Sequence, residues 1–297
     1  MKNSRFWISL LAGSLLTIFA SGAVSAKEPT ALLWAGCGIS KKAFMAELAA
    51  AYEKKTGIHI TLKGGGATRG IRSAAAGKID IGGACRITID GHPEERLAEQ
   101  IPVAWDALAV IVHKDNPVDN ITFKQLKRIY LGKITNWKQL GGRDAPIELY
   151  VRKGFNSGVG RTLRELVFAD YEVRFPAARF VVKSSGPLEK GIVKNPNGLG
   201  VTGISSAKRR AVKILKLEGH EPSYANIKNG SYLLYRPLYL VRKRGAENPA
   251  VDDFIRFALS KEGKEVIRRA GTVPYSDALV LVMKQLEQYK RASALGL

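Results

Sequence analysis

The sequence has few of the residues from which metal sites and nucleophilic sites are usually built. Only two of its 297 residues are cysteines, Cys37 and Cys85, and only four are histidines. There is no Cys-x-x-Cys pair, and no histidine stands at ligand spacing from another. Because a structural zinc site needs four such ligands, we expect no metal ion, and we predict no other cofactor.

Long apolar runs are also missing, except near the N-terminus. The run from Phe6 to Ala20 follows the cations Lys2 and Arg5 and is short for a spanning helix, which needs roughly 20 apolar residues. The small residues of Val24–Ala26 suit a signal peptidase, so residues 1–26 are predicted to be a cleaved signal peptide. The alternative is an N-terminal membrane anchor. Cleavage would leave a periplasmic protein without stable membrane insertion.

A lipoprotein signal is a further possibility, because Ala-Gly-Cys at residues 35–37 often ends such a signal. However, Cys37 lies well beyond the apolar run. The bulky Trp34 also stands where an acylation site carries a small aliphatic residue. Acylation of Cys37 is therefore disfavoured.

Acidic residues are scarce, since 26 Asp and Glu stand against 47 Lys and Arg, which gives a net charge of +21. Loss of Lys2 and Arg5 with the signal peptide takes this charge from +21 to +19. Such a chain attracts anions. An exported protein meets little nucleic acid, so small inorganic anions or anionic membrane surfaces are better candidates. Many of the cations are also expected to be ordinary solvated surface.

The N-terminal part alternates short apolar runs with helical patterns. Strands are predicted at Ala31–Ala35, Ile58–Leu62 and Ile79–Gly83, and a helix that is capped by Ser40 separates the first two. This β-α-β order predicts a parallel sheet with helices on its faces. Ligands bind outside the carboxyl ends of such strands. The three loops that follow these strands therefore meet at one edge of the sheet; they are Gly36–Ser40, Gly64–Thr68 and Ala84–Arg86.

Two long apolar strands divide the rest of the chain, one at Ala107–Val112 and one at Leu233–Val241. We interpret them as two crossings between two α/β lobes. Residues 27–110 and 236–297 would form the first lobe, and residues 111–235 the second. Further strands are predicted at Ile147–Val151, Phe180–Val182, Gly200–Thr202 and Val212–Leu215, and C-terminal helices at Pro249–Leu259, Lys261–Ala270 and Ala278–Lys290.

The most informative loop runs from Lys153 to Thr162, where a strand feeds a Gly/Ser/Asn-rich turn and a helix. The first turn of a helix presents unpaired N–H groups at its positive end, which suits an anion. Ser157 adds a hydroxyl, and Arg152, Lys153 and Arg161 add positive charge. An ordinary helix cap with surface cations is the alternative.

Two other loops have the same ingredients. Gly64–Gly70 offers close backbone approach, a hydroxyl and an arginine, and it is not a Walker A loop because the Gly-Lys-Ser/Thr ending is missing. Cys37–Ser40 is a third helix start. Three helix N-termini at the ends of strands favour an anion pocket more than any one of them does.

From Thr30 to about Tyr275 the chain resembles the periplasmic substrate-binding proteins of ABC importers, in their phosphate-binding branch. The resemblance rests on the order of four stretches. The first is the strand and helix at Leu32–Lys55, and the second is the turn at Gly64–Ile71. The third is the stretch IDIGGACR at 79–86, which is like the family's Asp-Ile-Gly-x-x-Ser-Arg. The fourth joins Gly132–Trp137, like the family's Gly-x-Ile-x-Asn-Trp, with Asn156–Val159, like its Gly-Ser-Gly-Thr.

The resemblance implies a type II two-lobed fold, each lobe a mainly parallel sheet flanked by helices, that closes around an oxyanion and delivers it to an ABC permease. A monomer without enzymatic activity is implied. The matching positions imply these ligand-binding residues: Gly38, Ile39, Ser40, Thr68, Arg86, Arg152, Lys153, Ser157, Gly158 and Val159.

Two departures leave the identity of the anion open. Some phosphate binders carry an Asp in the loop of Cys85 and Arg86, where it accepts the proton of hydrogen phosphate; no Asp stands here. Val159 replaces the usual Thr. Phosphate is the first candidate, and sulfate, molybdate, tungstate and phosphonate remain alternatives.

Other functions have less support in the sequence. A phosphatase of the Cys-x5-Arg type would need Arg where Ala43 and Gly91 stand, and the hydrolase elbow Gly-x-Ser-x-Gly is absent. The strong positive charge keeps a phosphate sensor, a surface adhesin or another polyanion-binding module as alternatives.

Finally, Cys37 and Cys85 each end a strand of the same lobe, and in this fold those two strands are neighbours. An exported protein with two cysteines favours a disulfide. We therefore predict a Cys37–Cys85 disulfide, which would stabilise the fold by roughly 4 kcal/mol. The alternative is a pair of buried free thiols.

Overall fold

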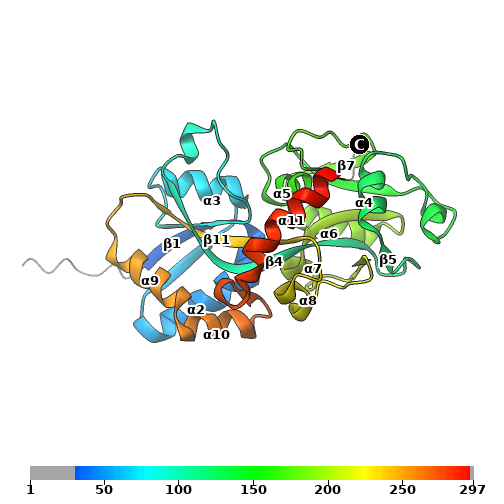
Figure 1. Ribbon diagram of the computed structural model, residues 1–297. Helices are drawn as coiled ribbons and strands as arrows, with labels where there is room; N and C mark the ends of the chain where they lie inside the picture. Colours follow the sequence, from blue (N-terminus) through cyan, green and yellow to red (C-terminus); the bar gives the residue numbers. More distant parts are fainter. Residues whose placement is uncertain (1–30, 295–297) are drawn as a thin grey trace, which may run out of the picture.

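One continuous sheet connects the two ends of the molecule (Figure 1). The computed structural model describes residues 31–294, so the predicted signal peptide lies outside the described residues. The strand order is β2-β1-β3-β11-β4-β8-β6-β7, and β9 and β12 each pair with β4. Among these strands, β1 is Ala31–Gly36, β2 His59–Lys63, β3 Ile81–Ala84, β4 Ala98–His113, β6 Glu148–Arg152, β7 Ala178–Val182, β8 Gly198–Gly203, β9 Val212–Ile214, β11 Tyr235–Lys243 and β12 Val273–Pro274.

Helices cover the sheet in each half of the molecule (Figure 1). They are α1 (Gly38–Ser40), α2 (Ala46–Thr56), α3 (Gly66–Ala75), α4 (Phe123–Tyr130), α5 (Gly158–Phe168), α6 (Ser185–Lys194), α7 (Ile204–Ala207), α8 (Tyr224–Asn229), α9 (Pro249–Leu259), α10 (Lys261–Arg269) and α11 (Val280–Ala294). A π-helical turn at Lys41–Met45 connects α1 with α2. A small separate sheet pairs β5 (Asn120–Ile121) with β10 (Lys216–Leu217).

The sheet divides into two lobes because β4 changes partners along its length. Residues Ala98–Ala107 of β4 pair with β11, whereas Leu108–Val112 pair with β8. In the first lobe β1 is parallel to both β2 and β3, and in the second lobe β6 is parallel to both β7 and β8. The two predicted crossover strands therefore correspond to β4 and β11, which pair antiparallel with each other at the junction.

The assignment of chain segments to the lobes stays a prediction, and the C-terminal helix bears on it. Helix α11 runs across the junction (Figure 1) and packs on α5 and α8 of the second lobe. Gln288 on α11 donates to the carbonyls of Leu233 and Tyr235, and Tyr289 donates to Glu165 on α5. Helix α11, which the sequence prediction assigned to the first lobe, therefore contacts the second lobe.

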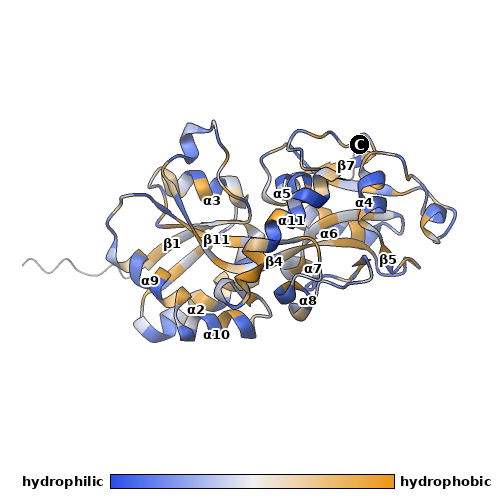
Figure 2. Ribbon diagram, in the orientation of Figure 1, coloured by the Kyte–Doolittle hydropathy of each residue, from blue (hydrophilic) through white to orange (hydrophobic). Residues whose placement is uncertain are grey.

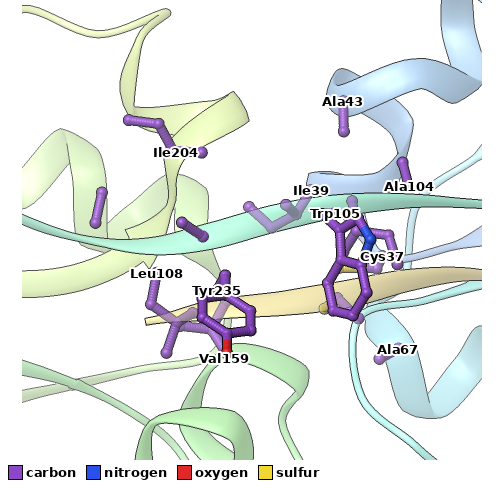
Figure 3. Close-up of a cluster of buried hydrophobic side chains, with 14 of the residues drawn as sticks. Cys37, Ile39, Ala43, Ala67, Ala104, Trp105, Leu108, Val159, Ile204 and Tyr235 are labelled. Carbon is purple, nitrogen blue, oxygen red and sulfur yellow. The ribbon is translucent and has the colours of Figure 1, made fainter. Parts of the chain in front are cut away.

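Buried apolar residues of the strands and helices form one core cluster, and the ribbons of the helices carry both hydrophobic and hydrophilic residues (Figure 2). At the junction, Trp105 on β4 and Tyr235 on β11 pack edge to face with ring centroids 5.9 Å apart. They belong to the same buried cluster as Cys37, Ile39 and Val159 (Figure 3). The core therefore continues from one lobe into the other beneath the loops that end β1 and precede α5.

The predicted cap of the first helix is wrong. Cys37, rather than Ser40, occupies the N-cap position, with extended backbone angles. The Ser40 side chain is fully buried inside the helical segment and donates its hydroxyl to the carbonyl of Ala84, 3.1 Å away. Ser40 therefore lies three residues after the N-cap Cys37, where its hydroxyl makes a tertiary contact with β3.

Candidate anion-binding site

A cavity of about 760 Å³ lies between the lobes, where loops that follow the carboxyl ends of strands of both lobes meet. The first lobe contributes the loops after β1, β2 and β3, and the second lobe contributes those after β6 and β7. The lining consists of Cys37–Ile39, Lys42, Gly64–Thr68, Cys85, Arg152–Val159, Lys183–Gly186 and Ser206.

The first-lobe wall depends on a close approach of β1 to β3. A Cβ at Gly36 would stand 2.3 Å from the carbonyl oxygen of Gly83, so only glycine fits there. Cys37 then donates its backbone N–H to the same carbonyl, at 2.9 Å. These contacts turn the chain so that the start of α1, at Gly38 and Ile39, faces the cavity.

Thr68 connects the two walls. Its hydroxyl donates to the carbonyl of Asn156 in the other lobe, at 2.9 Å. The Nε of Arg86 donates to the same carbonyl at 3.1 Å, and one of its terminal nitrogens donates to the Thr68 oxygen at 3.1 Å. The loop before α5 is thereby held against the first lobe.

Arg86 is paired behind the cavity and does not line it. Its terminal nitrogens donate to both carboxylate oxygens of Glu95, at 2.8 and 2.9 Å, and both side chains are about 1% exposed. Burial opposes ionisation of Glu95, but the bonds from Arg86 and Arg72 outweigh it and lower the pKa of this carboxyl. Arg86 thus positions Thr68 and Asn156 in this structure.

The variant Glu95→Gln should lower the free energy of unfolding by about 2 kcal/mol, since hydrogen bonds to charged groups contribute about 1.5–3 kcal/mol. Because the pKa of Glu95 is lowered by folding, its stabilisation is present above the ordinary glutamate pKa and is lost as the pH falls through the native value. Urea denaturation at pH 7 measures the effect. Glu94→Gln, at an exposed carboxylate that pairs with Arg72, is the control and should change stability by less than about 1 kcal/mol. Equal effects of the two substitutions would contradict the assignment.

The second-lobe wall is built by the end of β6 and the start of α5. Ser157 is the N-cap residue of α5, and its side-chain oxygen accepts the N–H of Gly160 at 3.0 Å. The hydroxyl proton of Ser157 and the first N–H groups of α5, at Gly158 and Val159, are left to donate elsewhere. All three residues line the cavity.

Arg152 is held by the loop after β7. One terminal nitrogen donates to the hydroxyl of Ser185 at 2.8 Å, and the other donates to the carbonyl of Lys183 at 3.0 Å. Its Nε is buried and has no hydrogen-bond partner within residues 31–294. Burial lowers the pKa of Arg152, but arginine remains a cation in proteins.

The charge of the lining has one sign. Among the residues that the structure describes, four cations line the cavity, namely Lys42, Arg152, Lys153 and Lys183, and no Asp or Glu does. Lys42 donates to the hydroxyl of Ser206 across the lobes at 2.6 Å, and burial lowers its pKa. Four basic side chains and several helix N-termini around one space form an environment for an anion.

The predicted disulfide is wrong, because the structure holds Cys37 and Cys85 as buried free thiols. The strand adjacency behind the prediction is correct: β1 pairs with β3 directly before these two residues. The thiols hydrogen-bond to each other instead of being joined. This hydrogen bond lowers the pKa of Cys37 and, together with burial, raises the pKa of Cys85.

Eight of the ten predicted site residues line the cavity, and Ser40 and Arg86 do not. The loop Lys183–Gly186 also lines the cavity, together with Lys42 and Ser206, and none of these was predicted as part of the site. A signal for that loop existed, because Ser184-Ser185-Gly186 follows the predicted strand Phe180–Val182 after a single residue, Lys183. The sequence around Lys42 and Ser206 contains no comparable signal, because the two residues are 164 positions apart and meet only in the folded protein.

The described residues offer neither a metal cluster nor a membrane span. Within residues 31–294 no group of three or more His, Cys, Asp and Glu side chains could hold a metal ion. Over the same residues, no helix combines the length and the apolar character that crossing a membrane would require.

The sequence profile of the PBP superfamily domain matches residues 23–262. The chain belongs to the PBP superfamily. This membership confirms the predicted resemblance and the two-lobed type II architecture. Among individual PBP relatives, the phosphate-binding protein PstS of Borreliella burgdorferi is 30% identical over 185 residues, which cover 60% of this chain and 66% of that protein. The chain therefore spans about two thirds of that relative's length.

Two solved PBP structures cover most of the chain. One is a Clostridium perfringens protein with bound phosphate, assigned as a phosphate ABC transporter substrate-binding protein. It is 31% identical, has a TM-score of 0.75, and the match covers 82% of this chain and 99% of that one. The other is an ABC-type phosphate transport receptor from Vibrio cholerae, 29% identical with a TM-score of 0.63, at the same coverage of 82% and 99%.

Proposed function

We propose that this protein is an extracytoplasmic solute-binding protein that captures phosphate, or a similar tetrahedral oxyanion, between its lobes and delivers it to an ABC permease. The observation that carries the proposal is the cavity lining, which combines four cations with the N-termini of α1 and α5 and contains no carboxylate. The phosphate-binding relatives and the phosphate-bound neighbour support phosphate as the ligand.

Within this proposal each wall has its own donors. The first-lobe wall offers the N–H groups at Gly38 and Ile39 and the region of Thr68. The second-lobe wall offers Ser157, the N–H groups of Gly158 and Val159, and the side chains of Arg152 and Lys153. An anion that receives donors from both lobes stabilises their contact, and the bonds Thr68–Asn156 and Lys42–Ser206 join the lobes beside it.

The proposal includes a periplasmic monomer that binds its ligand without converting it. Nucleic acid is not a proposed partner. No phosphate should be released from an aryl phosphate ester incubated with the protein.

The test is calorimetry on mature protein that has been stripped of ligand, with phosphate, sulfate and molybdate as titrants. Phosphate should bind to one site per chain. Arg152→Met should weaken phosphate binding by about 30-fold, because a charge-assisted hydrogen bond contributes about 2 kcal/mol. Arg143→Met is the control, since Arg143 is an exposed second-lobe arginine that donates to the carbonyl of Asp115 and does not line the cavity.

Two results would contradict the proposal. One is the absence of heat with every anion of the panel. The other is an equal affinity for phosphate in Arg152→Met and Arg143→Met. Tighter binding of sulfate than phosphate would change the ligand but keep the site, because the lining provides no carboxylate to accept a proton from hydrogen phosphate.

A further inference from the structure

The two cysteines form a feature of the cavity that anion capture does not require. Cys37 and Cys85 are 5% and 1% exposed, and both line the cavity between the lobes. The pairing of β1 with β3 brings the two thiols together, and they interact with each other. Two free thiols therefore lie next to each other. Both line a cavity that is large enough for small ions to enter.

The scaffold around the pair is rigid. Cys37 is the first residue after β1, and Cys85 is the first residue after β3. The two strands pair up to Gly36 and Gly83. Cys37 is the N-cap residue of α1, and its backbone N–H donates to the carbonyl of Gly83 on β3 at 2.9 Å. The Cys85 sulfur packs so closely on Gly158 that a Cβ there would stand 2.4 Å from it. Strand pairing and close packing thus hold the two cysteines next to each other.

The number of ligands restricts which metal ions could bind. In the described part of the chain, no third His, Cys, Asp or Glu joins the two thiols in a cluster. Zinc prefers four ligands, and calcium and magnesium prefer oxygen. Soft thiolate ligands select Cu(I), and Cu(I) is stable with two sulfur ligands alone.

The surrounding charges favour the complex that such an ion would form. Two thiolates with one monovalent cation carry a net charge of −1. The guanidinium of Arg236, which is buried and donates to the carbonyl of Cys85 at 3.0 Å, lies next to the pair. Arg152 and Lys42 line the same cavity. An anionic bis-thiolate complex therefore meets positive charge on several sides.

We propose that Cys37 and Cys85 together form a binding site for a soft monovalent cation, Cu(I), in the lining of the cavity. On binding, two sulfur–copper bonds form, and the two thiol protons pass to solvent. No oxidation or reduction takes place, because copper enters and stays as Cu(I). The site is independent of whether phosphate is the ligand of the cavity.

The experiment uses reduced mature protein under anaerobic conditions, free of phosphate. Cu(I) is supplied as its bicinchoninate complex, and the loss of the colour of that complex reports transfer to the protein. We expect transfer of one Cu(I) per chain. Each of Cys37→Ser and Cys85→Ser should weaken binding by at least about 100-fold, since even residues that only support a metal ligand typically contribute 10- to 100-fold.

Met45→Leu is the matched control, because Met45 is a buried sulfur-containing residue that does not line the cavity. It should bind Cu(I) as the wild type does. X-ray absorption on copper-loaded wild type provides a readout that needs no variant, and it should show two sulfur neighbours. The proposal is overturned if copper stays with bicinchoninate, if both serine variants bind as the wild type does, or if the first shell contains nitrogen or oxygen instead.

Discussion

The variant Gly158→Ala should weaken phosphate binding by about 10- to 100-fold, since overpacking of a close contact typically costs about 1–3 kcal/mol. Gly158 is the first residue of α5 in the second lobe, and it touches the first lobe directly. A Cβ at this position would stand 2.4 Å from the sulfur of Cys85 and 3.1 Å from the Cβ of Ala67. The lobes would have to separate, and the bond from Thr68 to Asn156 would lengthen.

A matched control lies in the same cavity. Gly186 also lines it, near the start of α6, but a Cβ there would meet no heavy atom within 4 Å. Gly186→Ala should therefore change the affinity for phosphate by less than about 3-fold, which corresponds to less than about 0.7 kcal/mol. Calorimetry on stripped protein compares the two variants directly.

The clash between the new methyl group at position 158 and Cys85 can also be relieved by shortening the Cys85 side chain. Cys85→Ala removes the sulfur atom that the new methyl group of Gly158→Ala would meet. The double variant should therefore recover part of the affinity lost by Gly158→Ala alone, which a double-mutant cycle would quantify. If Gly158→Ala bound phosphate as tightly as Gly186→Ala does, the contact between the lobes would have no role in binding.

The position of the cavity could be predicted because it depends on strand order and local turn chemistry. Loops rich in glycine after predicted strands, followed by helix starts, meet at one edge of a parallel sheet whatever the distant contacts are. Ser157 caps α5 as its sequence context indicates. The adjacency of β1 and β3 likewise brought Cys37 and Cys85 together.

The roles of single polar side chains were less predictable, because they depend on partners far along the chain or on burial. Ser40 looks like a cap, but its hydroxyl bonds the carbonyl of Ala84, 44 residues away. Arg86 looks like a ligand-facing cation, but Glu95 occupies its guanidinium. No local pattern distinguishes a free arginine from a paired one.

The full length of the crossover strand was also hidden. The apolar run Ala107–Val112 predicted a short strand, whereas β4 begins at Ala98. Pro102 interrupts the strand pattern, since proline cannot donate to a ladder. The structure accommodates it at an irregularity, where the pairing with β11 shifts register between Leu238 and Tyr239. Such a bulge cannot be inferred from either strand alone.

The second large effect is expected at the junction of the lobes, where Arg236→Met should lower the free energy of unfolding by about 3–5 kcal/mol. Arg236 on β11 stands opposite Asp106 on β4 in the antiparallel register. Its guanidinium lies 3.5 Å from the Asp106 carboxylate, and the two side chains are at most 3% exposed. Removal of one partner leaves a buried charge unpaired, and the bond to the carbonyl of Cys85 is lost as well.

Arg242 on the same strand is a control that has paired charges but a more exposed side chain. Arg242 on β11 pairs with Glu99 and Asp252, but its side chain is 32% exposed. Arg242→Met should therefore lower stability by about 1 kcal/mol or less. Urea denaturation of both variants at pH 7 provides the comparison. The double variant Asp106→Asn/Arg236→Met should be more stable than Arg236→Met, because the unpaired charge is then absent.

The pH dependence of the Arg236→Met deficit distinguishes an unpaired carboxylate from lost packing. Burial raises the pKa of Asp106 in the native state, and Arg236 opposes this rise. Without Arg236 the native pKa of Asp106 rises further. Between the two native values, the native state of the variant binds more protons than the native state of the wild type, so the deficit shrinks as the pH falls through this window. A change of up to about 1.4 kcal/mol per pH unit is the upper limit for one group. A deficit that stays the same throughout the pH titration would instead indicate that Arg236 stabilises the junction by packing and by its bond to the carbonyl of Cys85.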